Sequence, residues 1–479
     1  MRVPSGASAA VIRGALLLSF ITMKTYRLRT SFFTLFLGIG FAAAATERPP
    51  NIVVIVADDL GYADVLFNPQ HPKEVTTPHL DALAKESVIC RQGYVTGTVC
   101  SPTRTGLMTG RYQQRLGLYT AGQAGSGVPM SEKIFPQFLK PAGYVSMQVG
   151  KWHLGPTPEW SPALRGFDEV FGFLGRGAHD YFKLDDPEDP IYRGTTPVKE
   201  SGYLTDRWGQ ESVAFIGRNK SKPFFLYLAF NAVHAPLQAP PDEIAKFKTG
   251  DTQRNTLLAM GKRMDDAIGS VIAKLKSEGV WENTLLFFIS DNGGPLAQTA
   301  DNTPLRGGKH QTWEGGIRVP FLVCWPGKLK PGESQIAVSS LDILPTALAA
   351  AGVAAPADKP LDGVNLVPIL RGETPAPARN FFWTTGGEEG GWWAIRSGDW
   401  KLTAQQSKVG LFDLGKDASE KNDLAKQMPE KVAELTKLMD SWLAEMAAPI
   451  GGEGRRFGME RTTPPTKKPK SERKKKTKE

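Results

Sequence analysis

The sequence predicts an α/β protein with a large, mostly parallel β-sheet flanked by helices, followed by a small antiparallel sheet with one helix. Two observations predict this fold class. Up to about residue 374, continuous apolar segments alternate with helical segments, which is the pattern of parallel sheets with crossover helices. From about residue 375, short strands are separated by glycines and charged turns, which indicates an antiparallel sheet.

Four segments of the first part have the composition of buried strands. They are continuous runs rich in Val, Ile, Leu and Phe, and they lie at 51–57, 224–230, 285–289 and 319–325. Segments of helical character lie between them, for example at 78–86 and 256–278. Strands that alternate with helices in this way favour a single large sheet covered on both faces.

The second part contains three short strand-like runs, FFWTT, WWAIRSGDWKLT and VGLFDLG. Apolar residues at helical spacing then predict one amphipathic helix at 429–446 that covers a face of the small sheet. We therefore expect a first domain at 46–374, a C-terminal subdomain at 375–450, and a lysine-rich tail at 451–479 that is disordered.

Residues 1–45 have the features of an export signal. Counted from Met23, a second possible start, they contain a basic stretch, an apolar run at 32–41 and small residues where a signal peptidase could cut. An uncleaved anchor is the alternative, but the run is shorter than the ~20 residues that span a bilayer. We predict an exported protein, periplasmic or secreted, without a stable membrane span.

The formal net charge of +9 does not indicate a nucleic-acid-binding surface. Residues 1–45 carry +5 and residues 466–479 carry +6, which leaves −2 for the residues between them. The body of the protein is therefore close to neutral, and we expect no nucleic-acid partner.

Acidic residues follow two of the predicted strands. Asp58 and Asp59 come directly after the run at 51–57, and Asp291 and Asn292 follow the run at 285–289. The carboxyl ends of parallel strands meet at one edge of a sheet, where ligands bind in α/β proteins. An Asp-Asp pair alone is more often a turn or a helix cap, but two such strand ends together predict a site for Ca²⁺ or Mg²⁺, because all donors are oxygens.

The three cysteines do not form a disulfide framework, since one is left over in any pairing. Cys90 and Cys324 lie in apolar segments and are expected to be buried. Cys100 has a different context, because Pro102 suits the first turn of a helix and Gly110 suits its end. Residue 100 is therefore predicted at a helix N-terminus, where backbone N–H groups favour anionic oxygen.

The twelve residues from Cys100 to Arg111 (CSPTRTGLMTGR) resemble the signature of the type I sulfatases, the group that includes arylsulfatases and N-acetylgalactosamine-6-sulfatases. In that family a separate maturation enzyme recognises C-x-P-x-R and oxidises the cysteine to formylglycine. Both Pro102 and Arg104 of this recognition sequence are present. The resemblance implies the fold of alkaline phosphatase and its relatives, and a hydrolase of sulfate esters.

Three further motifs match the family in order: GKWHLG at 150–155, NAVHAP at 231–236 and RGGK at 306–309. By resemblance, Lys151 and Lys309 bind the sulfate and His234 protonates the departing alcohol. The nucleophile that the resemblance implies is a formylglycine gem-diol at position 100, steadied by Arg104, with His153 taking its second proton. The implied metal is calcium, with magnesium less favoured, and its ligands are Asp58, Asp59, Cys100, Asp291 and Asn292.

The sequence departs from the family pattern at one position. Some members have a serine before the His-Asp pair at 179–180, where this chain has Ala178. His179 and Asp180 are therefore candidates for substrate contact. Three aromatic residues could stack on a sugar: Tyr181, Trp392 and Trp393.

We expect the substrate to be a sulfated sugar or polysaccharide, with the loops at 175–193 and 386–393 deciding which one. The alternatives are a phosphatase or phosphonate-ester hydrolase of the same fold, and a non-catalytic glycan-binding relative. The second alternative predicts missing site residues, whereas only the variable serine is missing.

Overall fold

The computed structural model describes residues 48–121, 127–175, 177–386, 391–405 and 408–451. The predicted export signal at 1–45 and nearly all of the predicted tail lie outside the described residues. Within the described ranges, no helix is long and apolar enough to cross a bilayer.

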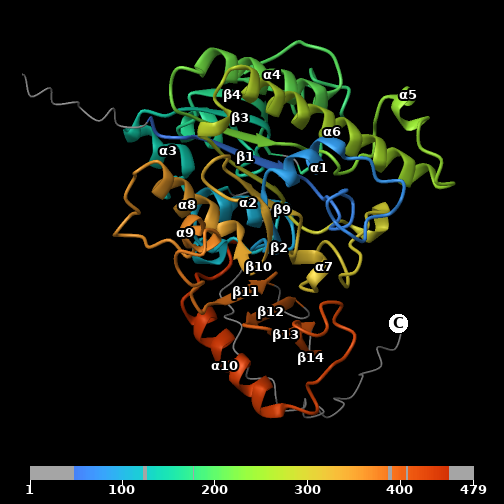
Figure 1. Cartoon of the computed structure of the whole chain (residues 1–479), viewed down its shortest axis with the longest axis vertical. Helices are drawn as coiled ribbons and strands as arrows, with labels where there is room; N and C mark the ends of the chain where they lie inside the picture. The colour runs from blue at the N-terminus through green and yellow to red at the C-terminus, as the bar shows by residue number, and fades with distance from the viewer. Residues whose placement is uncertain (1–47, 122–126, 176, 387–390, 406–407, 452–479) are drawn as a thin grey trace, which may run out of the picture. The chain divides into compact units, whose positions relative to one another are not determined.

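The described chain contains a ten-stranded sheet and a four-stranded sheet (Figure 1). The strands are β1 (Asn51–Ala57), β2 (Val88–Tyr94), β3 (Val145–Lys151), β4 (Glu169–Phe173), β5 (Tyr192–Arg193), β6 (Thr196–Pro197), β7 (Phe224–Ala229), β8 (Thr284–Ser290), β9 (Phe321–Cys324), β10 (Gly332–Ser339), β11 (Asn380–Thr384), β12 (Trp392–Ser397), β13 (Trp400–Gln405) and β14 (Lys408–Asp413).

The α-helices are α1 (Pro78–Lys85), α2 (Cys100–Thr109), α3 (Phe135–Leu139), α4 (Leu204–Asn219), α5 (Pro241–Ile244), α6 (Thr252–Ser277), α7 (Glu314–Ile317), α8 (Ile343–Ala350), α9 (Leu366–Leu370) and α10 (Pro429–Ala444).

The strand order of the large sheet is β10-β2-β9-β8-β1-β7-β3-β4-β5-β6. Its central strands β8, β1, β7 and β3 are all parallel to their neighbours in this group. The predicted α/β class with a mostly parallel sheet is therefore confirmed. The strand predicted at 319–325 is present as β9, but it runs antiparallel to both β8 and β2.

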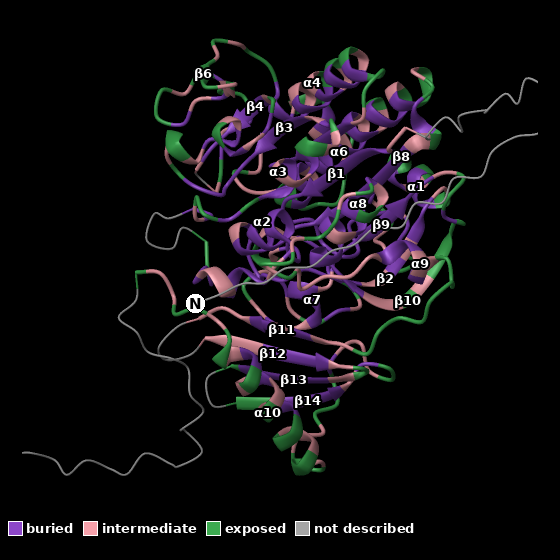
Figure 2. Cartoon of the chain, turned by 90° about the vertical axis from the view of Figure 1, so that its left-hand side faces the viewer, coloured by how far each residue is buried: buried purple, intermediate pink, exposed green. Residues whose placement is uncertain are grey.

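Strand β1 explains why both faces of the large sheet are covered. All seven of its residues are buried, and their side chains alternate between two apolar clusters. One cluster contains residues of α1, α4 and α6, and the other contains residues of α2, α3, α8 and α9. These two groups of helices cover opposite faces of the sheet (Figures 1 and 2).

Helix α6 begins four residues before its predicted start. The Asp251 side chain caps it, accepting hydrogen bonds from the backbone N–H groups of Gln253 at 2.8 Å and Arg254 at 3.2 Å. A capping carboxylate at this position satisfies N–H groups that have no partner within the helix. The polar first turn of the helix therefore forms without an apolar pattern.

The small sheet has the order β11-β12-β13-β14 and is antiparallel throughout, as predicted. The run at 392–403 forms a hairpin of two strands, β12 and β13. The predicted helix is present as α10, and its Leu435, Met439 and Trp442 pack with Ile395, Leu402 and Leu411 of the sheet.

Candidate active site

Four adjacent parallel strands deliver polar side chains to one edge of the large sheet. Asp58 and Asp59 follow β1, Asp291 and Asn292 follow β8, and His234 follows β7. Lys151 is the last residue of β3, and His153 comes two residues later. The strand order β8-β1-β7-β3 brings these groups together, as predicted for the two acidic strand ends.

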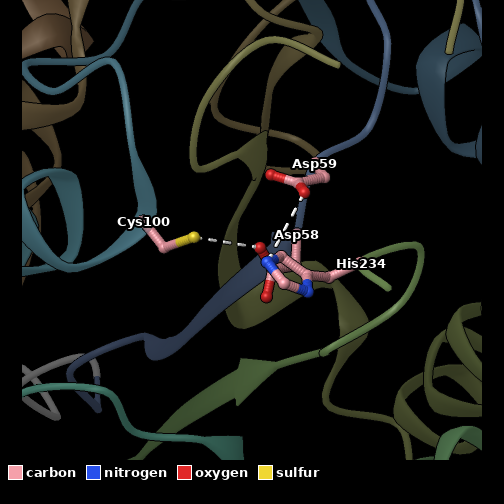
Figure 3. Close-up of side chains that lie close together, drawn as sticks. All are labelled: Asp58, Asp59, Cys100 and His234. Carbon is pink, nitrogen blue, oxygen red and sulfur yellow. Dashed lines mark hydrogen bonds and ion pairs between the residues drawn. The ribbon is translucent and has the colours of Figure 1, made fainter. Parts of the chain in front are cut away.

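Cys100 is the first residue of α2, and the helix ends before Gly110, which adopts the left-handed conformation at φ 67°. Both features agree with the prediction from the sequence. The Cys100 Sγ lies 3.4 Å from Asp58 Oδ1 and 3.6 Å from Lys309 Nζ. Figure 3 shows the Cys100 side chain pointing toward Asp58, with Asp59 and His234 beside it.

Asp58 is fully buried and faces two cations. Its Oδ2 accepts a hydrogen bond from Lys151 Nζ at 2.5 Å and lies 3.5 Å from Arg104 Nη2. Burial alone raises the pKa of this carboxyl, but the positive charge of Lys151 and of the other nearby cations outweighs burial. The pKa of Asp58 is therefore held well below its usual range, and the group is a carboxylate.

Asp59 lies in the left-handed backbone region at φ 63°, which is uncommon for a residue with a Cβ atom. Its carboxylate oxygens lie 2.7 and 2.8 Å from Lys309 Nζ. The Asn292 Nδ2 donates to Asp59 Oδ1 at 2.7 Å, and His234 Nε2 lies 3.6 Å from Asp59 Oδ2. This backbone conformation is the kind that persists where surrounding contacts fix it, as at functional sites.

Asp291 completes a set of three fully buried carboxylates. Its Oδ2 accepts from Arg104 Nε at 2.9 Å and lies 2.8 Å from Arg104 Nη2. Burial and the negative charge of Asp58 raise the pKa of Asp291 to about 6, although Arg104 opposes this effect.

The donor set fits a hard divalent cation. Asn292 Oδ1 is buried and has no hydrogen-bond partner among the residues that the structure describes, so an acceptor is left for a ligand. One ligand atom from each of Asp58, Asp59, Cys100 and His234 lies within 4.8 Å of the others. Carboxylate and amide oxygens are the ligands that Ca²⁺ and Mg²⁺ prefer.

The two histidines differ in their surroundings. His153 has φ 56° and is buried, and its Nδ1 has no hydrogen-bond partner within the described ranges. Burial and the charges of Lys151 and Arg104 lower the pKa of His153 well below its usual value, so this ring is neutral. His234 is held through Nδ1, which lies 2.6 Å from the Ala235 carbonyl oxygen.

The loop at 179–182 lies beside the His234 segment. Both ring nitrogens of His179 lie 2.7 Å from backbone carbonyl oxygens, those of Asp180 and Asp189. The Asp180 carboxylate accepts from Gln238 Nε2 at 3.1 Å and from the Phe182 N–H at 2.9 Å. Substrate contact by His179 and Asp180 stays a prediction.

The expectation that Tyr181 stacks on a sugar is wrong, because its ring is fully buried. The Tyr181 hydroxyl lies 2.5 Å from the Asn231 carbonyl oxygen and 2.8 Å from that of His234, so this residue anchors the loop that carries His234. Trp392 and Trp393 are half-buried: Trp392 packs against Trp313, and Trp393 packs in the cluster under α10.

Two residues near the site were missed from the sequence. Tyr227 of β7 is fully buried, and the positive charge of Arg104 partly opposes the rise that burial causes in the pKa of its hydroxyl. The signal was a single phenol in the otherwise apolar run FFLYLAF. Phe182, two residues after Asp180, is 45% exposed, and nothing in its local sequence distinguishes it from a loop residue.

Comparison with known proteins establishes the family. The Sulfatase family model matches residues 50–353, and the model described as N-sulphoglucosamine sulphohydrolase, C-terminal, matches residues 308–448. N-acetylgalactosamine-6-sulfatase of Homo sapiens is 36% identical over 359 residues, which cover 69% of this chain and 67% of that protein. Arylsulfatase A of Bos taurus is 33% identical over 459 residues, which cover 84% and 88% respectively.

A similar fold is found in a solved structure. The crystal structure of Ps i-CgsB in complex with k-i-k-neocarrahexaose is 36% identical in sequence and has a TM-score of 0.79 with this structure. The match covers 84% of this chain and 94% of the Ps i-CgsB chain. The resemblance found in the sequence is therefore confirmed: the chain belongs to the sulfatase family and is a sulfuric ester hydrolase.

Proposed function

We propose that this sulfatase removes sulfate from a sulfated sugar or polysaccharide, using formylglycine made from Cys100 and one bound calcium ion. One observation carries the proposal: the Cys100 Sγ, at the start of α2, lies 3.4 Å from Asp58 Oδ1 and 3.6 Å from Lys309 Nζ. A nucleophile at this position is within reach of both a carboxylate suited to a metal and a cation suited to sulfate.

Each of these two groups would supply one kind of chemistry. Formylglycine at position 100 would supply a nucleophilic hydroxyl that cysteine lacks. Calcium would supply positive charge that polarises the nucleophile and the sulfate oxygens, held by Asp58, Asp59, Asp291, Asn292 and residue 100.

The cations of the site orient and neutralise the sulfate group. Lys151 is fully buried and the Lys309 side chain is 9% exposed, so their charges act at low dielectric, where they stabilise the transition state most. Arg104 is held by Asp291 and steadies the side chain of residue 100. Magnesium would suit the same oxygen donors but keeps more of its water shell, so calcium is favoured.

The two histidines move protons. His234 donates to the alcohol oxygen as the bond to sulfur breaks, and Tyr181 fixes its backbone. His153 is neutral, so it can accept a proton from a hydroxyl group at residue 100.

The proposal of a sugar substrate rests on relatives and on the rim of the site. Ps i-CgsB was solved in complex with a neocarrahexaose, and a human relative is named N-acetylgalactosamine-6-sulfatase. The loop whose Tyr181 contacts the His234 carbonyl also carries Phe182, which is 45% exposed, and Asp180. These two side chains offer a stacking surface and a hydrogen-bond acceptor. These are the groups that bind sugar rings. We further propose that the protein is exported to the periplasm or secreted, where polysaccharides are met.

The test uses protein produced together with a formylglycine-generating enzyme. Mass spectrometry of the peptide containing residue 100 is expected to show the aldehyde in place of the thiol, and Cys100→Ala is expected to abolish turnover. A screen of defined sulfated sugars, with an aryl sulfate and a phosphate monoester for comparison, should give the highest kcat/KM for one of the sugars. Full activity with unmodified Cys100, or faster turnover of the phosphate ester, would contradict the proposal.

A further inference from the structure

Lys309 lies in a segment, residues 304–317, that does not belong to the large sheet. Residues 299–313 are all described and form turns rather than helix or strand. Gly307 and Gly308 come directly before the lysine, and Gly307 adopts a left-handed conformation at φ 73°. The backbone around Lys309 therefore does not fix the position of its ammonium group by itself.

One side of this segment faces the reactive centre. The Lys309 Nζ lies 2.7 Å from Asp59 Oδ1, and the neighbouring His310 N–H donates to the Thr98 carbonyl at 2.9 Å. Thr98 lies two residues before Cys100. The segment therefore lies against the residues just before the N-terminus of α2.

The other side of the segment is held by the small sheet. The Thr312 hydroxyl lies 2.7 Å from that of Thr403 in β13, although the two residues are 91 positions apart. The Trp313 ring meets Phe412 of β14 edge to face, with ring centroids 5.6 Å apart. These contacts join the segment to two strands of the small sheet.

A buried ion cluster strengthens this attachment. Lys401 of β13 places its Nζ 2.9 Å from Glu314 Oε1 and 2.8 Å from Glu420 Oε1, and all three side chains are fully buried. The Glu314 N–H donates to Glu420 Oε2 at 2.7 Å. The Arg306 guanidinium donates to the Glu420 carbonyl at 2.9 Å and stacks over Trp313. Buried polar networks of this kind fix one arrangement, because an unpaired member is costly.

The two faces of the small sheet make different contacts: one faces the segment at 304–317, and the other packs under α10. Successive side chains of a strand point to opposite faces. In β13, Lys401 and Thr403 face the segment, whereas Leu402 between them packs in the cluster under α10. One face of the sheet can therefore be altered without changing the other.

We infer that Lys401, Thr403 and Phe412 of the small sheet are positioning residues for Lys309. Through them, the small sheet fixes the position of the Lys309 ammonium group that binds sulfate. The inference rests on the proposed role of Lys309 in binding the sulfate group. Displacing a charged group by about 1 Å costs up to about 100-fold in rate, so loss of these contacts is felt at the reaction.

The test is the double variant Thr403→Val/Phe412→Leu in matured, calcium-loaded enzyme. We expect kcat/KM for an aryl sulfate to fall about tenfold, and the Kd for inorganic sulfate, measured by calorimetry, to rise several-fold. Thr403→Ser keeps the hydroxyl and should retain the wild-type values. The matched control is Ile395→Val/Leu402→Val, which alters the opposite face of the sheet and should lower Tm while leaving both constants unchanged.

A third background separates positioning from a general structural effect. In Lys309→Ala enzyme, the double variant should cause no further rise in the Kd for sulfate, because the displaced group is already gone. A full additional rise there, or an equal loss of activity in the control, would overturn the inference alone. Unchanged sulfate affinity in Lys309→Ala itself would overturn both the inference and the proposed role of Lys309.

Discussion

Charge pairing decides the chemistry of single residues at this site. Three buried carboxylates, Asp58, Asp59 and Asp291, face three cations, Lys151, Lys309 and Arg104. The nearby cations hold the pKa of Asp58 well below its usual range, whereas burial and the negative charge of Asp58 raise the pKa of Asp291 to about 6. The proposed metal ligands and sulfate-binding groups therefore change one another's protonation.

The role of His234 can be tested by changing the leaving group. A sugar alkoxide is a poorer leaving group than a phenolate, so hydrolysis of a sugar sulfate depends more on proton donation. His234→Ala should lower kcat by about 100-fold or more on a sulfated sugar but by about tenfold or less on 4-nitrophenyl sulfate. Steady-state kinetics on both substrates gives the two ratios.

The neighbouring exposed histidine provides the control for this measurement. His310→Ala should change the two rates by similar, small factors, since no proton transfer is assigned to His310. Equal losses on both substrates in His234→Ala would remove the proton-donor role.

At the scale of elements, one buried lysine serves two glutamates. Glu314 also receives a hydrogen bond from the Tyr94 hydroxyl at 2.6 Å and lies 3.5 Å from Arg318, whereas Glu420 depends on Lys401. The pKa of Glu314 is therefore lowered, because Lys401 and the nearby arginines outweigh burial. Burial raises the pKa of Glu420 to about 7, against the opposing charge of Lys401.

This difference predicts a pH dependence of stability. The folded state binds a proton on Glu420 more tightly than the unfolded state does, so protonation of Glu420 stabilises the folded protein. This stabilisation is complete below about pH 4.5 and is lost as the pH rises to about 7. Glu420→Gln should remove this decline, which amounts to no more than about 3 kcal/mol. Glutamine keeps the acceptor for the Glu314 N–H.

Urea unfolding at several pH values between 5 and 8 measures how the free energy of unfolding changes with pH. The control is Glu434→Gln, an exposed position, where this pH dependence should be the same as in the wild type. If the free energy of unfolding of Glu420→Gln depended on pH as strongly as that of the wild type, a group other than Glu420 would bind the proton.

The elements show which parts of the fold could be predicted from the sequence. The runs at 51–57, 224–230 and 285–289 were predicted because central strands of a parallel sheet are buried on both faces. The antiparallel direction of β9 was missed because a short apolar run carries no information on direction. Strand β10 was missed because its sequence, GESQIAVS, is polar and mostly accessible at the edge of the sheet.

At the scale of the whole molecule, the prediction of the site depended on where its residues lie in the chain. The strand-end acids and the Cys100 segment were found because each has its own local pattern. Thr312 and Thr403 could not be paired in advance, since their contact depends on how the small sheet meets the segment at 304–317. Tyr181 was misread because an aromatic residue next to an acid looks the same in sequence whether it faces a substrate or the core.

A second group of possible metal ligands lies away from this site and consists of His79, Asp265 and Asp266. The two carboxylates of this group already make hydrogen bonds or ion pairs within the protein. Both oxygens of Asp265 accept hydrogen bonds from the first turn of α1, at 3.0 and 2.7 Å. The Lys262 ammonium lies 2.5 Å from Asp266. We therefore expect calcium to act on stability through the strand-end site and not through this second group.

Calcium should couple the site to the stability of the whole chain. An ion that binds only the folded state stabilises it by about 2.7 kcal/mol at 100 times its Kd. Scanning calorimetry should show a lower Tm after treatment with a chelator, recovery on calcium addition, and a smaller recovery with magnesium. Asn292→Ala removes a buried oxygen acceptor that has no hydrogen-bond partner among the described residues, so its Tm should respond only at higher calcium concentration. Asp266→Asn should respond like the wild type, because its carboxylate belongs to the second group. A Tm that is insensitive to the chelator in fully active enzyme, or recovery with zinc instead of calcium, would exclude a calcium site at these strand ends.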